Sequence, residues 1–495
     1  MKLLNRATSQ QGFIDLHNHT DSGFGWERGH MNLTPLQYLE EVRQYVEKFP
    51  DASVSFSITD HNNTDSNLKI IEKIKENPEK YSKINYIPGC EYTVSCDSIG
   101  HCYDKDGNPK PIVADNKLHM LAYGMDLEDP TLKYLNTLMD TSKKYVREYI
   151  TEYKPEKFGN IIFATKAWLK QRNMDIEIGE FKDDCQLQDT FDNTVAVVDK
   201  FLRKRFNFNK EEMKDWNDFV NNQDNILKYT KADVQEVMSI VENAGGYCVL
   251  AHPLYVGQSQ DFQHINDEDN KDPRNDKFRD MPFNDEIYKN LSTNYSKYQK
   301  LPEDFKTKNL KSMENYYDYI YRTLSVNAEN PITHKKLNGI IGHELMHTAN
   351  QKNPFRFNII KNIGDKYGLY CTAGSDSHGH MRENVIPSRV VGPQVYNYDA
   401  KTDYLTSAYA ITRCDFVNDY IDSQKTGKRL QRQEGRTASN QLELIKTING
   451  KITRYNMNDF TRLLFASYKN AKIKEKSKNR RLQNVRNTIE EIKEF

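Results

Sequence analysis

Six of the thirteen histidines lie at or near the ends of short apolar runs. Two pairs have i, i+2 spacing, His17-x-His19 and Asp376-x-His378. On a strand, such residues point the same way, so each pair can chelate one ion if the strand geometry continues to its end. Imidazole and carboxylate groups are the usual ligands of zinc, manganese and iron. The candidate ligands are His17, His19, His61, Glu91, His119, His252, Asp376 and His378.

The apolar runs that must position these residues alternate with helical patterns. Strands are expected at 12–16, 53–58, 85–87, 118–123, 247–251 and 368–372, and helices at 34–48, 66–76, 231–243 and 354–366. This alternation indicates an α/β fold with a largely parallel sheet or barrel. Polar residues just past the strands would then gather at the C-terminal rim, where such barrels assemble active sites.

Two stretches interrupt this alternation, and the chain divides accordingly. The barrel is expected over 1–125, 231–255 and 331–395, the last containing the GSDSH motif. A mostly helical insertion over 126–230 and a polar, Tyr/Lys/Asn-rich insertion or lid over 256–330 separate these parts. Residues 396–495 are expected to form a helical extension with a basic tail, because Leu482, Val485, Ile489 and Ile492 recur at heptad-like spacing.

Composition narrows the classes of protein to which the chain can belong. Lys plus Arg equal Asp plus Glu at 70 each, so bulk charge favours no nucleic-acid role and only local basic segments can. Seven scattered cysteines are typical of free thiols in a reducing compartment. Without a secretory leader or a long apolar run, we expect a cytoplasmic protein with no membrane partner.

Six ordered motifs resemble those of the PHP (polymerase and histidinol phosphatase) family. They span about residues 13 to 380, with unusually long segments between them. The motifs are Phe13-Ile-Asp-Leu-His-Asn-His-Thr20, Ile58-Thr-Asp-His61, Pro88-Gly-Cys-Glu91, Leu118-His-Met-Leu-Ala-Tyr123, Val249-Leu-Ala-His-Pro253 and Gly374-Ser-Asp-Ser-His-Gly379.

The resemblance implies a distorted (β/α)7 barrel, with two to three divalent ions (Mn, Zn or Fe), that hydrolyses phosphate esters. Glu91 is the natural bridging carboxylate, and Asp376 is a second carboxylate with a catalytic role. Ions at such a site lower the pKa of a bridging water and neutralise phosphate oxygens. The family pattern also places an Asp after the HxH pair. Asp21 is the candidate, although its spacing is shorter than in the family.

The expected substrate is a phosphate ester, with a nucleotide or nucleic acid favoured because of the two insertions and the basic tail. Arg382 and Arg389, just after the last motif, are candidates to clamp a substrate phosphate, with surface charge as the alternative. Basic residues at 428–436 and 472–486 can follow a nucleic-acid backbone or simply be solvated. The insertions or the C-terminal helix are expected to offer surfaces to a protein partner.

Three alternatives stay open. The first is a small-molecule phosphatase of the histidinol-phosphatase type. The second arises from His343-Glu-Leu-Met-His347, a literal HExxH, which on a helix would bind zinc with Glu344 as the general base of a metalloprotease. The third is a non-catalytic scaffold in which the metal site is structural.

Overall fold

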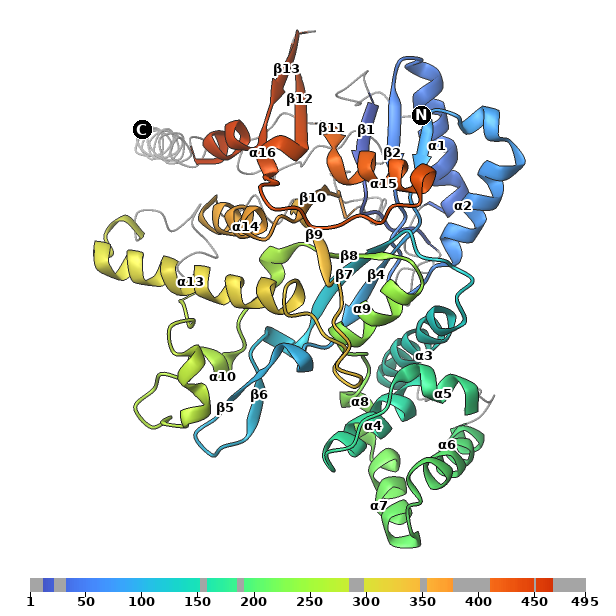
Figure 1. Ribbon diagram of the computed structural model, residues 1–495, viewed down its shortest axis with the longest axis vertical. Coiled ribbons are helices and arrows are strands. Elements are labelled where there is room, and N and C mark those ends of the chain that lie inside the picture. The colour runs from blue at the N-terminus through green and yellow to red at the C-terminus, as the bar shows by residue number, and fades with distance from the viewer. Residues whose placement is uncertain are drawn as a thin grey trace, which may run out of the picture.

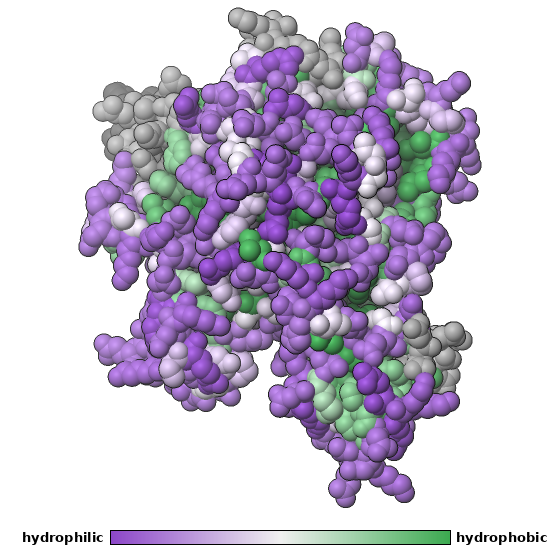
Figure 2. Space-filling model, viewed as in Figure 1, coloured by the Kyte–Doolittle hydropathy of each residue, from purple (hydrophilic) through white to green (hydrophobic). Residues whose placement is uncertain are grey.

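The computed structural model describes residues 12–21, 33–151, 158–184, 191–284, 298–347, 354–376, 410–448 and 451–465. Helices and several sheets are interspersed along this part of the chain, so the protein is a mixed α/β protein, as predicted (Figure 1). None of its described helices is both long and apolar enough to cross a bilayer. The face shown in Figure 2 is predominantly hydrophilic, with apolar residues in small separate patches.

The first sheet contains β1 (Gly12–Asp15), β2 (Ser53–Phe56) and β3 (Ile84–Tyr86), all parallel. Two helices connect these strands, α1 (Pro35–Lys48) and α2 (Asp65–Glu76). As expected, α1 begins with Thr34, whose side chain accepts a hydrogen bond from the backbone N–H of Gln37. The helix buries Tyr38, Leu39 and Val42 in the same hydrophobic cluster as β2. The apolar face of α1 therefore packs against the first sheet.

The second sheet has the order β10-β9-β8-β7-β4. Its strands are β4 (Gly89–Val94), β7 (Leu118–Tyr123), β8 (Tyr247–Leu250), β9 (Ile340–Met346) and β10 (Tyr370–Ala373). β8, β9 and β10 are parallel, whereas β7 is antiparallel to both of its neighbours. The expectation of a largely parallel arrangement therefore fails at β7, which places the start of this strand beside the ends of others.

Residues just beyond the strand ends join the two sheets at two places. Leu16 N–H donates to Ala373 O at 2.9 Å, linking β1 to β10. Glu91 N–H donates to Asp60 O at 3.3 Å, and a parallel bridge pairs His61 with Glu91. The described strands nevertheless form separate sheets and not one continuous closed barrel. The (β/α)7 barrel remains a prediction.

Helices cover one end of the second sheet and extend beyond it. Residues 126–230 contain helices throughout their described part, lying together at one end of the molecule (Figure 1). Trp168 and Trp216 are fully buried there, and the indole N–H of Trp216 donates to Thr165 Oγ1 at 3.0 Å. The helices are α3 (Pro130–Thr151), α4 (Phe158–Lys170), α5 (Ile178–Asp184), α6 (Phe191–Phe206), α7 (Lys210–Asn221), α8 (Gln223–Lys228) and, against the sheet, α9 (Val234–Asn243).

The described part of the polar segment 256–330 contains more helix than its composition suggests. It contains α10 (Gln260–Gln263) and α13 (Glu303–Leu324), a helix of 22 residues that packs against α14 (Pro354–Lys366). Tyrosines of α13 supply buried rings while their hydroxyl groups find acceptors. Tyr316 donates to Gly257 O at 2.9 Å and Tyr317 to Val256 O at 3.1 Å. The described part of α13 is therefore core and not a lid.

The C-terminal extension was predicted to be helical, and its described part contains both helices and strands. Strands β11 (Ala410–Cys414), β12 (Leu442–Ile448) and β13 (Lys451–Tyr455) form an antiparallel sheet beside helices α15 (Asp415–Thr426) and α16 (Ala438–Gln441). Leu442, Leu444 and Ile445 of β12 are buried, so side chains on both sides of this strand contribute to the core. The heptad-like segment and the basic run 472–486 lie outside the described residues.

Candidate metal centre

Glu91 is the centre of a buried cluster of histidines. Its carboxylate is 1% exposed, and its two oxygens face different imidazoles. Oε2 faces His17 at 3.2 Å, His19 at 3.3 Å and His61 at 3.0 Å, whereas Oε1 faces His119 at 2.8 Å and His252 at 2.9 Å. One carboxylate thus stands between two sets of nitrogen donors.

Two groups of side chains in this cluster can each hold a metal ion. The ligand atoms of the first group, His17, His19, Glu91 and Asp376, lie within 4.8 Å of one another. The second group is His61, Glu91 and His119, by the same measure. Both groups contain Glu91, so two ions bound here would share a carboxylate.

The spacing of the donor atoms fits coordination. His17 Nε2 and His19 Nε2 are 3.2 Å apart, and His19 Nε2 is 3.2 Å from Asp376 Oδ1. Donors about 2.0–2.2 Å from a tetrahedral ion lie roughly 3.3 Å from each other. Imidazole nitrogens and carboxylate oxygens that face one another form the donor set that zinc, manganese and iron prefer. The residues therefore fit the metals that the sequence predicted.

The strands place the ligands at one edge. His17 and His19 follow β1, His252 follows β8 and Asp376 follows β10. Thr93 of β4 pairs with His119 of β7, and Glu91, two residues before Thr93, points to the same side. The antiparallel direction of β7 explains how His119, near the start of its strand, reaches residues at the ends of the others.

Buried polar contacts hold the HxH segment in place. Asp15 Oδ1 accepts the backbone N–H of Ser375 at 2.9 Å, and Asn18 Nδ2 donates to Ser57 O at 3.1 Å. Asp60 accepts both the backbone N–H and the hydroxyl of Thr20, at 2.6 and 2.8 Å. These bonds tie the ends of β1, β2 and β10 together, and they fix the two imidazoles.

Backbone conformation at the centre is unusual in two places. His252 and Asp376 have φ of 23° and 50°, in the left-handed region that residues other than glycine rarely adopt. Such conformations persist where the surroundings impose them, and they cluster at functional sites. Gly374 is required by packing, because a Cβ there would lie 2.2 Å from His17 Cβ and 2.4 Å from Glu344 Oε1.

The charges of the cluster are strongly coupled. Burial alone would lower the pKa of His17, but Glu344, Glu91 and Asp376 raise it well above its usual value. Burial likewise opposes ionisation of Glu91, yet the surrounding histidines hold its pKa well below the usual range. Burial lowers the pKa of His119. A cation at the centre would replace protons as the partner of these carboxylates.

The HExxH segment belongs to a strand, so the metalloprotease interpretation is wrong. Residues 340–346 form β9, and a register shift leaves Leu345 as an extra residue against β10. Glu344 faces the centre and His343 faces away from it, and the bulge lets His347 face the centre as well. His343 Nδ1 lies 2.9 Å from the Tyr321 hydroxyl, whereas the His347 ring lies 5.3 Å from the ring of His252. The two imidazoles therefore cannot hold one zinc.

Glu344 positions a candidate ligand. The Nδ1–H of His17 donates to Glu344 Oε1 at 2.9 Å, and the backbone N–H of His252 donates to Oε2 at 2.8 Å. A carboxylate on the far nitrogen fixes the tautomer and orientation of a metal-binding imidazole.

We expect Glu344→Gln to lower metal affinity or kcat/KM by about 10–100-fold, because an amide cannot accept both bonds. A chelator-competition titration and an assay with p-nitrophenyl phosphate would measure these two effects. Wild-type values in both assays would show that Glu344 does not position His17.

His343 gives a prediction about acid stability. Burial, and then the charge of Lys361, lower its pKa to about 3. Below pH 6.5 the unfolded chain binds a proton at this residue and the folded chain does not, so folded stability falls toward pH 3. The slope is at most about 1.4 kcal/mol per pH unit. Urea unfolding of metal-free wild type and His343→Gln should show a stability difference that shrinks between pH 6.5 and 4.5. A difference independent of pH would contradict this.

The remaining predicted site residues divide into two sets. Asp21 lies in a described turn, where its N–H donates to Leu33 O at 3.0 Å, and it belongs to neither candidate metal group. His378, Arg382 and Arg389 lie outside the described residues.

His347 was not among the predicted ligands, yet its Nε2 lies 3.4 Å from Asp376 Oδ2. Its position after the apolar run 340–346 is the same signal that marks the other histidines.

Comparisons with known proteins give limited information. No protein-family model matches the chain, and no curated protein matches it. One similar solved structure is that of a candidate metal-dependent phosphoesterase from Bifidobacterium adolescentis. The sequences are 16% identical, the match covers 78% of this chain and 94% of that chain, and the TM-score is 0.33. At these values, the function must be argued from the residues of this chain.

Proposed function

We propose that this protein is a metal-dependent hydrolase of phosphate esters, of the PHP type, that works with at least two divalent ions. The observation that carries the proposal is the pair of candidate metal groups that share Glu91. Paired sites of this kind serve displacement at phosphorus, where charge must be neutralised on attacking and leaving oxygens. Manganese, zinc and iron all suit the donor set.

The chain's residues have distinct roles in this proposal. His17, His19 and Asp376 with Glu91 would hold one ion, and His61 and His119 with Glu91 the other. When bound, the ions supply Lewis-acid charge to the phosphate and activate water. Glu91, 1% exposed, would be shared by the two ions. Glu344 keeps Nε2 of His17 directed at Glu91.

The exposed edge of the cluster indicates where a substrate would enter. The side chains of Asp376 and His119 are each 17% exposed and that of His61 is 11% exposed, whereas His17 and His19 are fully buried. A phosphate group would therefore meet the centre between Asp376 and the His61–His119 side. The buried imidazoles behind them provide a rigid, water-poor wall, which strengthens electrostatic interactions.

Within this class, we favour a nucleotide or nucleic-acid substrate, in a cytoplasmic enzyme. The long additions to the core and the basic segment Lys428–Arg436 support this preference over a histidinol-phosphatase type of substrate. The six described cysteines are all free thiols, which is compatible with a reducing compartment.

A substrate screen tests the proposal. Metal-stripped protein, reloaded with Mn²⁺, Zn²⁺ or Fe²⁺, would be assayed with p-nitrophenyl phosphate, thymidine 5′-phosphate esters and labelled RNA and DNA oligonucleotides. Hydrolysis of any of these that requires metal supports the hydrolase. If the protein hydrolysed the small esters but cleaved none of the oligonucleotides, it would not be a nuclease. Bound metal with no hydrolysis of any phosphate ester would favour the structural scaffold.

A further inference from the structure

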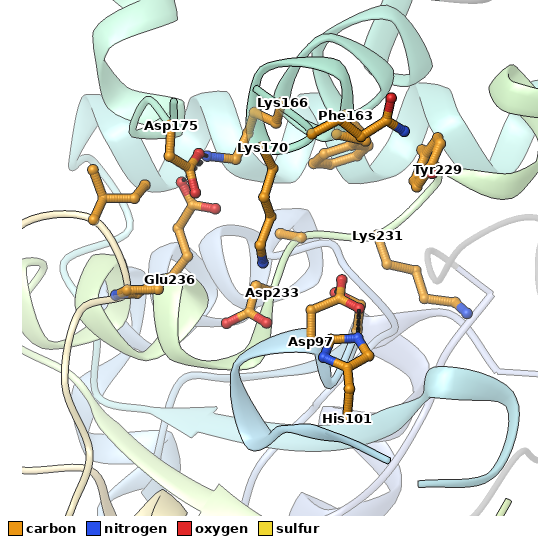
Figure 3. A pocket seen from close by; sticks show the side chains of 16 residues that line it. Asp97, His101, Phe163, Lys166, Lys170, Asp175, Tyr229, Lys231, Asp233 and Glu236 are labelled. Atoms are coloured by element: carbon orange, nitrogen blue, oxygen red, sulfur yellow. Dashed lines mark hydrogen bonds and ion pairs between the residues drawn. The ribbon is translucent and has the colours of Figure 1, made fainter. Parts of the chain in front are cut away.

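A second cavity lies between the helical segment and the sheet (Figure 3). Its volume is about 290 Å³, near the lower end of the range for small-molecule sites, about 300–1,000 Å³. α4 contributes one wall and the residues just before and within α9 another, with η4 (Asp97–Ile99) opposite. Charged and aromatic side chains line it together, among them Asp97, Phe163, Lys170, Tyr229, Lys231 and Asp233.

The backbone register links this cavity to the metal centre through β4 and β7. Val94 pairs with Leu118, so Ser95 follows on the same edge as Lys117, two residues from His119. Ser95 N–H donates to Ala232 O at 2.8 Å, and Val234 N–H donates to Ser95 O at 2.9 Å. Ser95 lines the cavity and lies four residues beyond Glu91, roughly 13 Å along an extended chain.

The carboxylates of the cavity already have donors from the protein. Asp233 accepts the backbone N–H groups of Gln235 and Ser98, at 2.9 and 2.8 Å. Asp97 accepts Asn116 Nδ2 at 2.9 Å and the Ser95 hydroxyl at 3.2 Å.

The other two carboxylates of the cavity, Asp175 and Glu236, also have donors from the protein. Lys166 lies 3.0 Å from Asp175 and 3.3 Å from Glu236, and Glu236 also accepts the backbone N–H of Ile178 at 2.8 Å. Each of these four acids thus already has donors from the protein.

Two lysines of the cavity, Lys170 and Lys231, feel the charge of Asp97 at longer range but form no ion pair of their own among the described residues. Among the described residues, no carboxylate lies within ion-pair distance of Lys170 or Lys231, and Figure 3 shows Lys170 extending into the space between α4 and Asp233. Burial, and then the charge of Lys117, lower the pKa of Lys231. The Lys231 ammonium has therefore lost water without a carboxylate at ion-pair distance, and an incoming anion would stabilise it, with the exposed Lys170 beside it.

We propose that this cavity binds the anionic group, phosphate or carboxylate, of a small organic ligand whose flat or apolar part lies against Phe163 and Tyr229. Lys170 and Lys231 would supply the charge, and the rings would supply the apolar contact. Two sources can present this chemistry. One is the remote end of the molecule hydrolysed at the metal centre, and the other is a separate effector. The anion site itself does not depend on the proposed hydrolase activity.

The direct test measures the affinity of the metal-free protein for inorganic pyrophosphate, the probe, by isothermal titration calorimetry. We expect Lys170→Gln/Lys231→Gln to weaken binding about tenfold or more. The matched control Lys200→Gln/Lys214→Gln removes the same charge from exposed lysines of α6 and α7 and should bind as the wild type does. Lys170 is exposed, so Lys170→Gln alone tests the site without endangering folding. Wild-type affinity in both lysine variants, or no binding to the wild type, overturns the proposal.

Kinetics of the metal-loaded protein distinguish the two sources. n-Alkyl phosphates would be compared with carboxyalkyl phosphates of increasing length. A rise in KM for the carboxyalkyl series alone, in the double variant, assigns the cavity to the substrate. Unchanged KM for both series, with pyrophosphate binding lost, assigns it to an effector. If the wild type hydrolyses no ester yet binds pyrophosphate through these lysines, the hydrolase proposal fails while the anion site stands.

Discussion

Glu91→Gln is expected to reduce kcat/KM for p-nitrophenyl phosphate about a thousandfold or more and to prevent stable binding of two ions. Each oxygen of Glu91 faces its own set of histidines, and an amide provides only one acceptor and no charge. Metal ions contribute several kcal/mol of transition-state stabilisation, and each 1.36 kcal/mol is a factor of ten in rate. Steady-state kinetics and elemental analysis of the purified variant measure both effects.

Glu72→Gln is the matched control for this prediction. Glu72 is an exposed residue of α2, so the same chemical change there should leave metal content and kcat/KM as in the wild type. If Glu91→Gln kept two ions and activity within tenfold of the wild type, Glu91 would not be the shared ligand.

His17→Ala/His19→Ala is expected to remove one ion and lower kcat/KM by about a thousandfold. Both residues belong to the group with Asp376, whereas the His61–Glu91–His119 group stays complete. Metal content should therefore fall from two ions to one per chain. The loss of one ion removes the charge that it would place on the phosphate.

His264→Ala/His334→Ala controls for the loss of two imidazoles. Their side chains are 59% and 77% exposed, and neither lies in a candidate metal group. This variant should keep both ions. Full metal content and activity in His17→Ala/His19→Ala would show that the HxH pair holds no ion.

Local patterns were sufficient to predict much of the fold. The helices at 34–48 and 354–366 and the strand at 118–123 are found within a residue of their predicted bounds, because capping residues and apolar periodicity act within a few residues. Strand direction depends on distant partners, so the antiparallel course of β7 could not be seen. The polar composition of 256–330 did not indicate that α13 has a buried face. The helical periodicity expected after residue 395 did not indicate that 442–448 form a strand.

The candidate centre followed from the positions of its histidines. The structure brings His17, His19, Glu91 and Asp376 together, as the strand-end pattern predicted. The role of Glu344 and the place of His347 could not be derived from spacing. The place of His347 depends on the bulge at Leu345, which lies between it and the regularly paired Glu344. Without that bulge, residues four apart such as His343 and His347 would lie on one side of the strand.

The proposed hydrolysis of phosphate esters depends on two ions held through Glu91. Its most direct test is stepwise addition of Mn²⁺ to chelator-stripped wild-type protein, with metal content and hydrolysis of phosphate esters measured on the same samples. We expect no hydrolysis in the metal-free protein and activity that saturates when at least two ions are bound per chain. Full activity without metal, or two bound ions without hydrolysis of any phosphate ester, would contradict the account.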